Sequence, residues 1–418
     1  MSESIELSVD AARERLLARL PAARVVDTTL DAADGRVLAQ DVNAHLDSPA
    51  FTNAAMDGYA LRAHDVHDVP TTLRVVTTIP AGRSDAVKLS DGDAARIMTG
   101  APIPSGADCV VRFEDTDEIE PRARGNAVEI RRMPVAGQHV RPAGEDVRAG
   151  AVLLRAGTLL DPLACGALAA QGIGTVPVYA SPRVTLIATG DEVVGVGQAL
   201  AHGQVYDANT PLLQAAIVRA GGVVTTVGMS SDSAADLRRA FSAPGAADLI
   251  ITTGGVSVGD FDTVKQVLAA DGEVEFWKVQ MRPGHHIAFG LLDGTPILGL
   301  PGNPIAAWIA FLQFGVPALH ALRGLQRRGL PQVAARITTA VTAPGPRRHF
   351  VRATLAWEAG GWQVTPLAVH GSALLASSLA ANALLVVPEG SDGFQPGDVA
   401  QVQVLDPVAA IYSASIPA

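Results

Sequence analysis

The sequence predicts a multidomain α/β plus β protein, in which a central, doubly wound α/β domain joins β-rich N-terminal segments and a small C-terminal β domain. From residue 182 onward, apolar runs alternate with helical patterns, which is typical of a mostly parallel sheet covered by helices on both faces. From about residue 20 to residue 180, and again after about residue 330, Gly and Pro interrupt short Val- and Thr-rich runs, which indicates strands and turns.

Capping side chains and first-turn prolines mark the helix starts. Ser8 precedes an amphipathic helix, and Asp161 with Pro162 begins another, which Gly172 can end. In the α/β part, Asn209 is the expected cap of a helix that closes at a pair of glycines. The other elements expected in this part are strands at 183–189, 223–227, 249–253 and 296–300, and helices at 233–241 and 260–270.

Composition limits the classes of function. The 418 residues suffice for about three domains, and their formal net charge of −10 argues for solubility and against a general nucleic-acid surface. Cys109 and Cys165 have no metal-binding spacing, so we expect no disulfide framework and a reducing, cytoplasmic setting. Acidic and arginine residues interrupt the apolar positions of residues 1–20, which disfavours a secretory signal.

One apolar segment resembles a membrane span. Residues 294–322 contain no Asp, Glu, Lys or Arg. Pro301, Pro304 and Pro317 divide the segment, and its helical part is expected to cover only about a dozen residues, whereas a bilayer needs roughly 20. We therefore predict a strand, a tight turn and a deeply buried helix, and no membrane partner.

A glycine-rich loop, 253-TGGVSVGD-260, lies where a predicted strand ends and a helix begins. In α/β sheets, ligands bind beyond the carboxyl ends of the strands. Gly254 and Gly255 allow the backbone to approach a ligand closely, Ser257 can add a hydroxyl group, and the helix N-terminus suits a phosphate. The alternative is a tight strand-to-helix turn in which Asp260 is a plain cap. The Walker A and G-x-G-x-x-G patterns are both absent.

Carboxylates follow three predicted strands. Asp262 lies one turn into the helix after the glycine-rich loop, where it can face a ligand or a metal ion. Gly190-Asp191-Glu192 follows the strand at 183–189, and Asp232 follows another strand. Carboxylate oxygens at strand ends indicate ligation of magnesium or of hydroxyl groups. Capped turns explain the same residues without any ligand.

A further strand end carries 301-PGNP-304, where Asn303 suits a helix cap and the backbone amides can bind an oxyanion. The segment 276-FWKVQMRPGHHIAFG-290 brings Lys278 and Arg282 next to these loops, which suits metal-assisted handling of a phosphate or oxyanion. His285 and His286 are adjacent, so in a strand they would face opposite sides, and we expect no metal site from this pair.

Eight motifs occur in one order along nearly the whole chain: 49-PAFTNAAMDGYAL-61, 96-RIMTGAPIPSGAD-108, 144-GEDV-147, 188-ATGDE-192, 206-YDANTPLL-213, 252-TTGGVSVGDFD-262, 276-FWKVQMRPGHHIAFG-290 and 299-GLPGNP-304. Each motif alone is modest, but all eight together are highly specific. With them the chain resembles molybdopterin molybdotransferase, the MoeA and gephyrin E-domain family.

The resemblance implies the last step of molybdenum cofactor synthesis. Adenylated molybdopterin and molybdate would be the substrates, molybdate would be placed on the dithiolene sulfurs, and AMP would be released with a divalent cation, usually Mg²⁺. It further implies an elongated homodimer with an active-site cleft between subunits. A molybdopterin adenylyltransferase and recipient molybdoenzymes are the expected partners.

The family fold also suggests domain boundaries for this chain. The four expected domains are an extended α+β domain at 1–50 and 140–180, an inserted β-rich domain at 51–139, the α/β domain at 181–328, and the C-terminal β domain at 329–418.

Site residues follow from the motifs position by position. The catalytic positions are expected at Asp57, Thr99, Glu192, Asp232, Asp262, Lys278 and Arg282, and the metal is expected at Asp262 and Glu192. The substrate-binding positions are expected at Gly254, Gly255, Ser257, Pro301, Asn303, Pro304, Arg352 and Ser372, the last two near molybdate.

Two departures from the family pattern stand out. The common Lys-Pro-Gly-Lys is Arg282-Pro-Gly-His285 here, which makes one charge pH-dependent. The common Asn-Ser-Ala-Met-Asp has Ala54 in place of its serine, which removes a hydroxyl group. Two alternatives stay open: a catalytically weakened scaffold or carrier paralogue that binds molybdopterin, and a different adenylate- or phosphate-handling enzyme.

Overall fold

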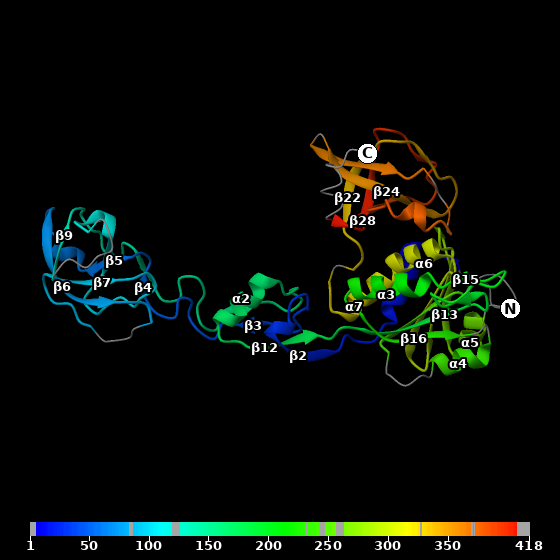
Figure 1. Cartoon of the computed structure of the whole chain (residues 1–418), viewed down its shortest axis with the longest axis horizontal. Helices are drawn as coiled ribbons and strands as arrows, with labels where there is room; N and C mark the ends of the chain where they lie inside the picture. Colours follow the sequence, from blue (N-terminus) through cyan, green and yellow to red (C-terminus); the bar gives the residue numbers. More distant parts are fainter. Residues whose placement is uncertain are drawn as a thin grey trace. The chain divides into compact units, whose positions relative to one another are not determined.

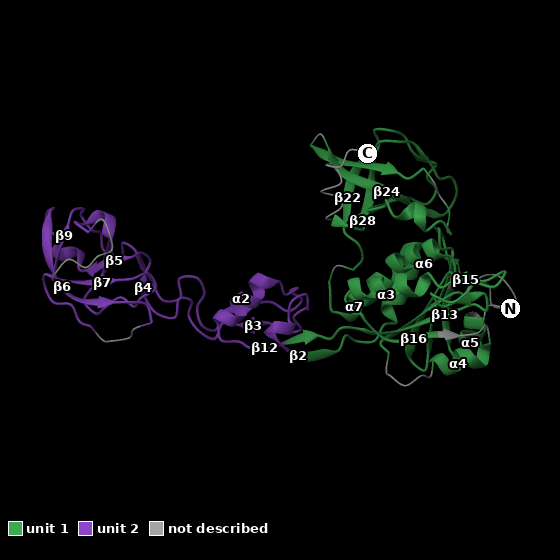
Figure 2. Cartoon of the chain, viewed as in Figure 1, with its two compact units in different colours: residues 1–27, 177–418 green, residues 28–176 purple. Residues whose placement is uncertain are grey.

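The computed structural model describes residues 6–82, 87–118, 126–230, 233–241, 247–255, 263–326, 328–358, 360–368, 371 and 373–407. They form two compact units, one of residues 1–27 and 177–418 and the other of residues 28–176 (Figure 2). The chain passes between the units through β2 (Val25–Thr29) and β12 (Thr175–Tyr179), which pair with each other.

The first unit contains the predicted α/β domain, built on a seven-stranded sheet (Figure 1). Four neighbouring strands of this sheet are parallel, which confirms the doubly wound fold class. In their order in the sheet, these strands are β21 (Thr295–Leu300), β17 (Leu249–Thr253), β13 (Arg183–Thr189) and β16 (Val223–Ser230).

Three further strands extend the sheet beyond β21. They are β20 (His286–Leu292), which runs antiparallel to β21, then β18 (Glu273–Val279) and the short β1 (Glu6–Leu7). β18 runs antiparallel to β20 and is therefore parallel to the central strands. The carboxyl ends of all the parallel strands thus lie at one edge of the sheet, where the sequence places its candidate loops.

Alternate residues of the central strands face two different hydrophobic cores, as expected for a sheet covered on both faces. Ile187 and Ile250 face a smaller core that includes Leu237 and Val264. Leu186 and Ile251 face the larger core on the other side. The helices of the smaller core are α4 (Ala234–Phe241) and α5 (Thr263–Asp271), and those of the larger core include α1 (Val9–Ala18) and α3 (Asn209–Arg219).

The N-terminal helix α1 packs in the core of the α/β domain. The backbone N–H of Ala11 donates to Oγ of Ser8, which confirms the predicted cap. Val9, Ala12 and Leu16 are fully buried among side chains of the large core. The structure thus groups residues 6–27 with the α/β domain, whereas the sequence analysis grouped them with residues 28–50.

The apolar segment forms one continuous helix, which corrects its predicted length of about a dozen residues. It comprises α6 (Pro304–Ala310), a π-helical turn (Phe311–Gly315) and α7 (Val316–Leu322). Within the described residues, this helix alone is long and apolar enough to cross a membrane, and 83% of its most apolar window is buried inside the fold. The prediction of a deeply buried helix is confirmed.

Pro317 does not divide this helix because its missing N–H is compensated. A proline leaves the carbonyl of the residue four positions earlier without its helical partner. That carbonyl belongs to Gln313, and Nε of Arg13 in α1 donates to it at 3.2 Å. The expectation that Pro317 divides the helix was therefore wrong, because a tertiary contact supplies the lost hydrogen bond.

The predicted C-terminal β domain is a closed barrel. Its strands pair in a ring because the first one bonds to both the second and the last. In that order they are β24 (Arg348–Glu358), β25 (Gly361–Pro366), β22 (Gln332–Ile337), β28 (Val399–Val404) and β26 (Ala383–Val387). The barrel has its own core, which includes Ala353, Leu355 and Val402.

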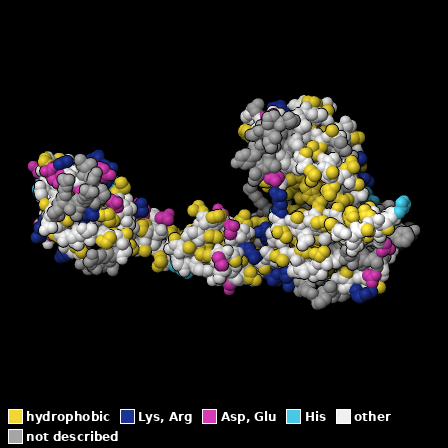
Figure 3. All heavy atoms as spheres, viewed as in Figure 1, with side chains coloured by type: hydrophobic (Ala, Val, Ile, Leu, Met, Phe, Trp, Pro, Cys, Tyr) yellow, Lys and Arg dark blue, Asp and Glu magenta, His cyan; other side chains and the backbone are white. Residues whose placement is uncertain are grey.

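The second unit contains a five-stranded sheet and a helical segment. The strands are β8 (Cys109–Arg112), β5 (Gly58–Leu61), β7 (Asp93–Ile97), β6 (Thr71–Ile79) and β9 (Ala127–Ile130). Helix α2 (Pro162–Ala170) begins at Asp161, whose carboxylate accepts from the N–H of Ala164, as predicted. On the face drawn in Figure 3, acidic and basic side chains are interspersed over the described surface of this unit.

Candidate active site

A cavity of about 1840 Å³ lies in the first unit at the carboxyl edge of the α/β sheet. One wall consists of the loops after β13, β17 and β21, and the other consists of the barrel loops 339–344 and 365–368 together with the start of β24. The predicted site residues that line it are Glu192, Gly254, Gly255, Arg282, Pro301, Asn303, Pro304 and Arg352.

Asn209 ties the loops after β17 and β21 together, and Thr189 at the end of β13 donates to the carbonyl of Thr253. Its Nδ2 donates to Oγ1 of Thr253 at 2.7 Å and to the carbonyl of Gly302 at 2.6 Å. Its Oδ1 is buried and has no hydrogen-bond partner among the described residues. Oγ1 of Thr253 in turn donates to the carbonyl of Pro301. The floor of the cavity is therefore one connected polar structure rather than three independent turns.

The prediction that Asn209 caps α3 was wrong. Oδ1 of Asp207 accepts from the N–H of Thr210, and this is the side-chain bond at the start of the helix. Both residue types favour caps, and only the tertiary partners of Asn209 distinguish them.

Glycine is required at Gly254 by close packing as well as by its backbone angle. Its φ is +94°, and a Cβ atom there would lie 2.6 Å from the backbone oxygen of Thr189 in the neighbouring strand end. Its N–H donates to the carbonyl of Leu300 at 3.0 Å. Gly255 also has a positive φ, of +63°. Ser257, Asp260 and Asp262 lie outside the described residues.

Among the predicted metal ligands, the structure describes Glu192, which lines the cavity and folds back over Gly190. Carboxylate oxygens are the donors that Mg²⁺ prefers. Within the described part of the chain, no group of three or more His, Cys, Asp or Glu could hold a metal ion. Asp232 and Asp262 fall outside that part. Of these three expected carboxylates, the structure therefore places only Glu192 at the cavity.

Arg282 reaches the cavity on a strand that leaves the α/β sheet. β19 (Met281–Arg282) pairs in parallel with β24 of the barrel, and Arg282 lies in register with His349. Lys278 stays on β18, half-buried and in register with His286, and it is not part of the described lining. Of the two expected cations, the structure therefore places Arg282 at the cavity wall and Lys278 on β18, the preceding strand in the chain.

The expectation that His285 and His286 face opposite sides was wrong. Their ring centroids are 4.8 Å apart, and both residues line the cavity. Strand β20 begins only at His286, so strand alternation does not apply to His285. Nδ1 of His285 donates to the carbonyl of Val279 at 2.8 Å and lies 3.6 Å from a carboxylate oxygen of Glu6, which fixes the ring.

Arg352 lies in the cavity wall and is only 3% exposed. Its Nη1 donates to the carbonyl of Leu374 and to the hydroxyl of Ser378. Burial lowers the pKa of its guanidinium, as expected for a cation that is partly removed from water. Ser372, its expected companion near molybdate, lies outside the described residues.

Sequence reasoning missed His349, which also lines the cavity. Burial lowers the pKa of its imidazole, and the charges of Arg282 and Arg347 lower it further. Nothing local in the sequence singles this residue out, because its position follows from the pairing of β19 with β24.

In the second unit, the structure brings Asp57 and Thr99 together. The backbone N–H and the hydroxyl of Thr99 both donate to Oδ1 of Asp57, at 2.6 and 2.7 Å. These two bonds, with a smaller contribution from Arg96, hold the pKa of Asp57 below its usual range. Asp57 is exposed, so an ordered, ionised carboxylate faces solvent on this unit.

The cavity combines three features that suit a large, multiply charged substrate. Arg282 and Arg352 provide positive charge for oxyanions, and three histidines line the same cavity. Backbone at the glycine-rich loop and at Gly302 allows close approach to phosphate groups. Glu192 adds a carboxylate on the α/β side. The arrangement can bind and orient a phosphorylated ligand beside a second oxyanion, and its described lining contains no Ser or Cys.

Three family models match successive parts of the chain. They describe the MoeA N-terminal region (domains I and II) at residues 7–172, a probable molybdopterin binding domain at 185–321, and the MoeA C-terminal region (domain IV) at 334–405.

Relatives of known name match nearly the whole chain. Molybdopterin molybdenumtransferase 2 of Mycobacterium tuberculosis is 40% identical over 397 residues, which cover 92% of this chain and 96% of the relative. Molybdopterin molybdenumtransferase of Haemophilus influenzae is 34% identical over 401 residues, covering 95% and 98%. A crystal structure of a MoeA protein from Pyrococcus horikoshii superposes with a TM-score of 0.82 at 29% identity, covering 96% of this chain and all of that one. The chain therefore belongs to the MoeA family.

Proposed function

We propose that this protein is a molybdopterin molybdenumtransferase, which inserts molybdenum from molybdate into adenylated molybdopterin and releases AMP. The observation that carries the proposal is the cavity, in which two arginines, three histidines and two carboxylates line the glycine-rich strand ends. The near full-length similarity to named molybdenumtransferases supports the same activity. No observation favours the alternative hypothesis, a weakened scaffold or carrier paralogue.

The cavity residues would bind and orient both substrates. Arg282 and Arg352 lie on the barrel side and would neutralise the dianionic molybdate, because a guanidinium donates paired hydrogen bonds to oxyanions. The loops at Gly254 and Gly302 would hold the phosphates of the adenylate. Enclosure between two walls would exclude water, which strengthens each electrostatic contact. Positioning and polarisation, rather than a protein nucleophile, would then favour cleavage.

Mg²⁺ is part of this proposal. When bound, it would neutralise the phosphates and favour departure of AMP. Glu192 is the described residue that would contribute to holding it, and Asp262 is the expected second ligand. The protein would act in the cytoplasm, receiving the adenylate from a molybdopterin adenylyltransferase and passing the product to molybdoenzymes.

We further propose that the active unit is a homodimer in which Asp57 and Thr99 of one copy complete the cavity of the other. Support comes from the carboxylate of Asp57, which is held in place by Thr99 and exposed on the surface of its unit. Mixing an Asp57→Asn variant with an Arg282→Gln variant tests this, because one intact site per mixed dimer would restore activity. No recovery on mixing, with mixed dimers verified by mass, would place both residues in one copy's site.

The deciding experiment measures AMP release from adenylated molybdopterin, with Mg²⁺, in the presence and absence of molybdate. Release that depends on molybdate and yields active cofactor supports the transferase. Tight binding of the adenylate without release identifies a carrier instead. Release that is indifferent to molybdate identifies a different adenylate-handling enzyme.

A further inference from the structure

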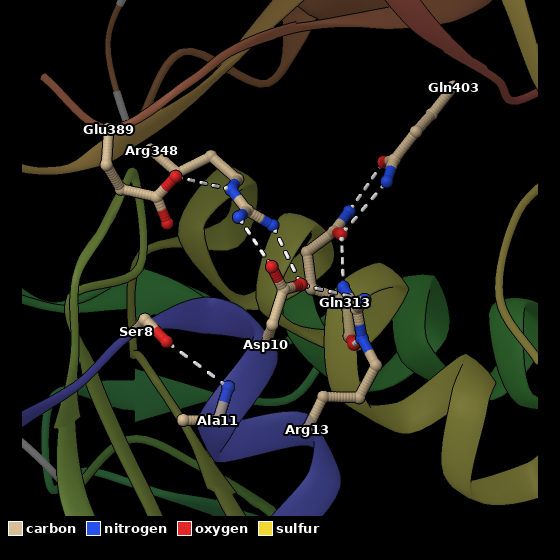
Figure 4. A network of polar contacts seen from close by, with 8 residues as sticks. All are labelled: Ser8, Asp10, Ala11, Arg13, Gln313, Arg348, Glu389 and Gln403. Atoms are coloured by element: carbon tan, nitrogen blue, oxygen red, sulfur yellow. Dashed lines mark hydrogen bonds and ion pairs between the residues drawn. The ribbon is translucent and has the colours of Figure 1, made fainter.

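Arg348 has three carboxylate contacts but no place in the cavity lining. Its Nη1 and Nη2 donate to the two carboxylate oxygens of Asp10 at 2.9 and 2.7 Å, and its Nε donates to Glu389 at 3.0 Å (Figure 4). The side chain of Arg348 is 19% exposed, and two carboxylates balance its charge. It is therefore committed to protein partners rather than to a substrate anion.

Asp10 connects this arginine to the rigid part of the α/β domain. It lies in the first turn of α1, whose apolar face is fully buried in the large core. A bidentate pair with a carboxylate fixes the orientation of a guanidinium as well as its distance. The ion pair thus attaches the start of β24, a barrel strand, to a helix of the neighbouring domain.

Arg348 is also the residue at which β19 joins the barrel. Met281 lies in register with Arg348, and Arg282 lies in register with His349. The backbone N–H of Arg348 donates to the carbonyl of Gln280 at 3.0 Å. Because β19 pairs with the barrel and not with the α/β sheet, the position of Arg282 in the cavity depends on where β24 begins.

The N-terminal segment braces the same loop from its other side. The N–H of Gln280 donates to the carbonyl of Leu7 at 2.8 Å. A carboxylate oxygen of Glu6 lies 3.6 Å from Nδ1 of His285. The loop that carries Arg282 is therefore held between β1 and β24, and Asp10 joins the two supports through Arg348.

We propose that Asp10 and Arg348 are positioning residues that hold Arg282 in place to bind molybdate. The inference rests on the proposed function, because it assigns the oxyanion to Arg282. Neither residue touches the substrate, so each acts through the placement of β19 and β24. Disruption of the pair would weaken oxyanion binding while leaving the cores of the α/β domain and of the barrel intact.

The chain offers a control in a second link between the same two domains, which contacts Asp10 only through Arg13. Gln313 of the long helix and Gln403 of β28 exchange two side-chain hydrogen bonds, at 2.7 and 3.1 Å (Figure 4). Both residues are buried, and β28 does not pair with β19 or β24. Gln403→Leu should therefore lower the melting temperature without changing the affinity for molybdate.

The test is a double-mutant cycle on the full-length protein, with the Kd for molybdate measured by isothermal titration calorimetry. Asp10→Asn and Arg348→Lys should each raise this Kd roughly 3- to 10-fold, in the lower part of the range for coupled contacting residues. The KM for molybdate should rise similarly while kcat changes little. In an Arg282→Gln background, Asp10→Asn should have almost no further effect. If one of the two single variants misfolds, the other still tests the inference.

Three results would overturn the inference. An effect of Asp10→Asn that is equally large without Arg282 would show that the pair does not act through that residue. An equal rise in Kd for Gln403→Leu would show that both links affect molybdate binding only through the general stability of the protein. Unchanged affinity in Asp10→Asn and Arg348→Lys would show that the pair does not position the site. A wild-type protein that binds no molybdate would instead refute the proposed function, and this inference with it.

Discussion

Replacing Asn209 by Ala tests whether the three strand-end loops form one connected floor. The change removes the hydrogen bonds to Thr253 and Gly302. Each is worth about 1 kcal/mol net, and a buried carbonyl left unpaired adds up to about 1–3 kcal/mol. The change also removes Oδ1, which is buried without a described partner, and this removal offsets part of the lost stability. We expect the free energy of unfolding to fall by about 2 kcal/mol.

Urea denaturation of the wild-type and Asn209→Ala proteins measures this loss, and a titration with AMP measures its effect on the cavity. Gln214→Ala is the matched control, because Gln214 is exposed on the same helix and should change stability by less than about 0.5 kcal/mol. Asn209→Asp should cost more than Asn209→Ala, since it sets a carboxylate against the Gly302 carbonyl. A loss below about 0.5 kcal/mol for Asn209→Ala would refute the connected floor.

Three further predictions concern other parts of the site and fold. Gly254→Ala should lower the free energy of unfolding by about 2–4 kcal/mol in a denaturant titration, because the new Cβ meets a backbone oxygen at 2.6 Å and a φ of +94° disfavours alanine; a loss under about 1 kcal/mol would show that the loop relaxes. Thr99→Val should raise the pKa of Asp57 toward its ordinary value in an NMR titration, because it removes the hydroxyl bond that is the largest cause of the lowering; an unchanged pKa would place the cause elsewhere. Burial alone raises the pKa of Asp248, but its contacts with Arg183 lower it overall. Stability from Asp248 should therefore be full above its unfolded pKa and lost as pH falls below about 4. An Asp248→Asn variant that loses as much stability between pH 6 and pH 3 as the wild type would contradict this.

Local sequence patterns predicted the α/β part well because each pattern there has a local cause. Runs of five to seven residues dominated by Val, Leu, Ile and Thr became the parallel strands β13 and β17, which are buried on both faces. Ser8 and Asp161 cap helices because their side chains reach an N–H three residues ahead in the chain. The loops at Gly190, Gly254 and Pro301 line one cavity because parallel strands end at one edge of a sheet.

The predictions that failed depended on partners far away in the chain. Asn209 looks like a cap, but its amide pairs with residues more than 40 positions away. Pro317 looks like a helix breaker, but Arg13 satisfies the carbonyl that it frees. His285 looks like a strand residue, but the strand begins one residue later. For Asn209 and Pro317, a tertiary contact changed the role that residue type and spacing suggest.

By itself, the sequence determined the fold class, the glycine and proline turns at the strand ends, and the motifs by which the chain resembles the MoeA family. Hydrophobic periodicity and turn chemistry act over a few residues, so both can be read along the chain. Only the tertiary structure decided that β19 leaves the α/β sheet for the barrel, which sets Arg282 beside His349. The pairing joins residues more than 60 positions apart, and no local pattern in the sequence records such a contact.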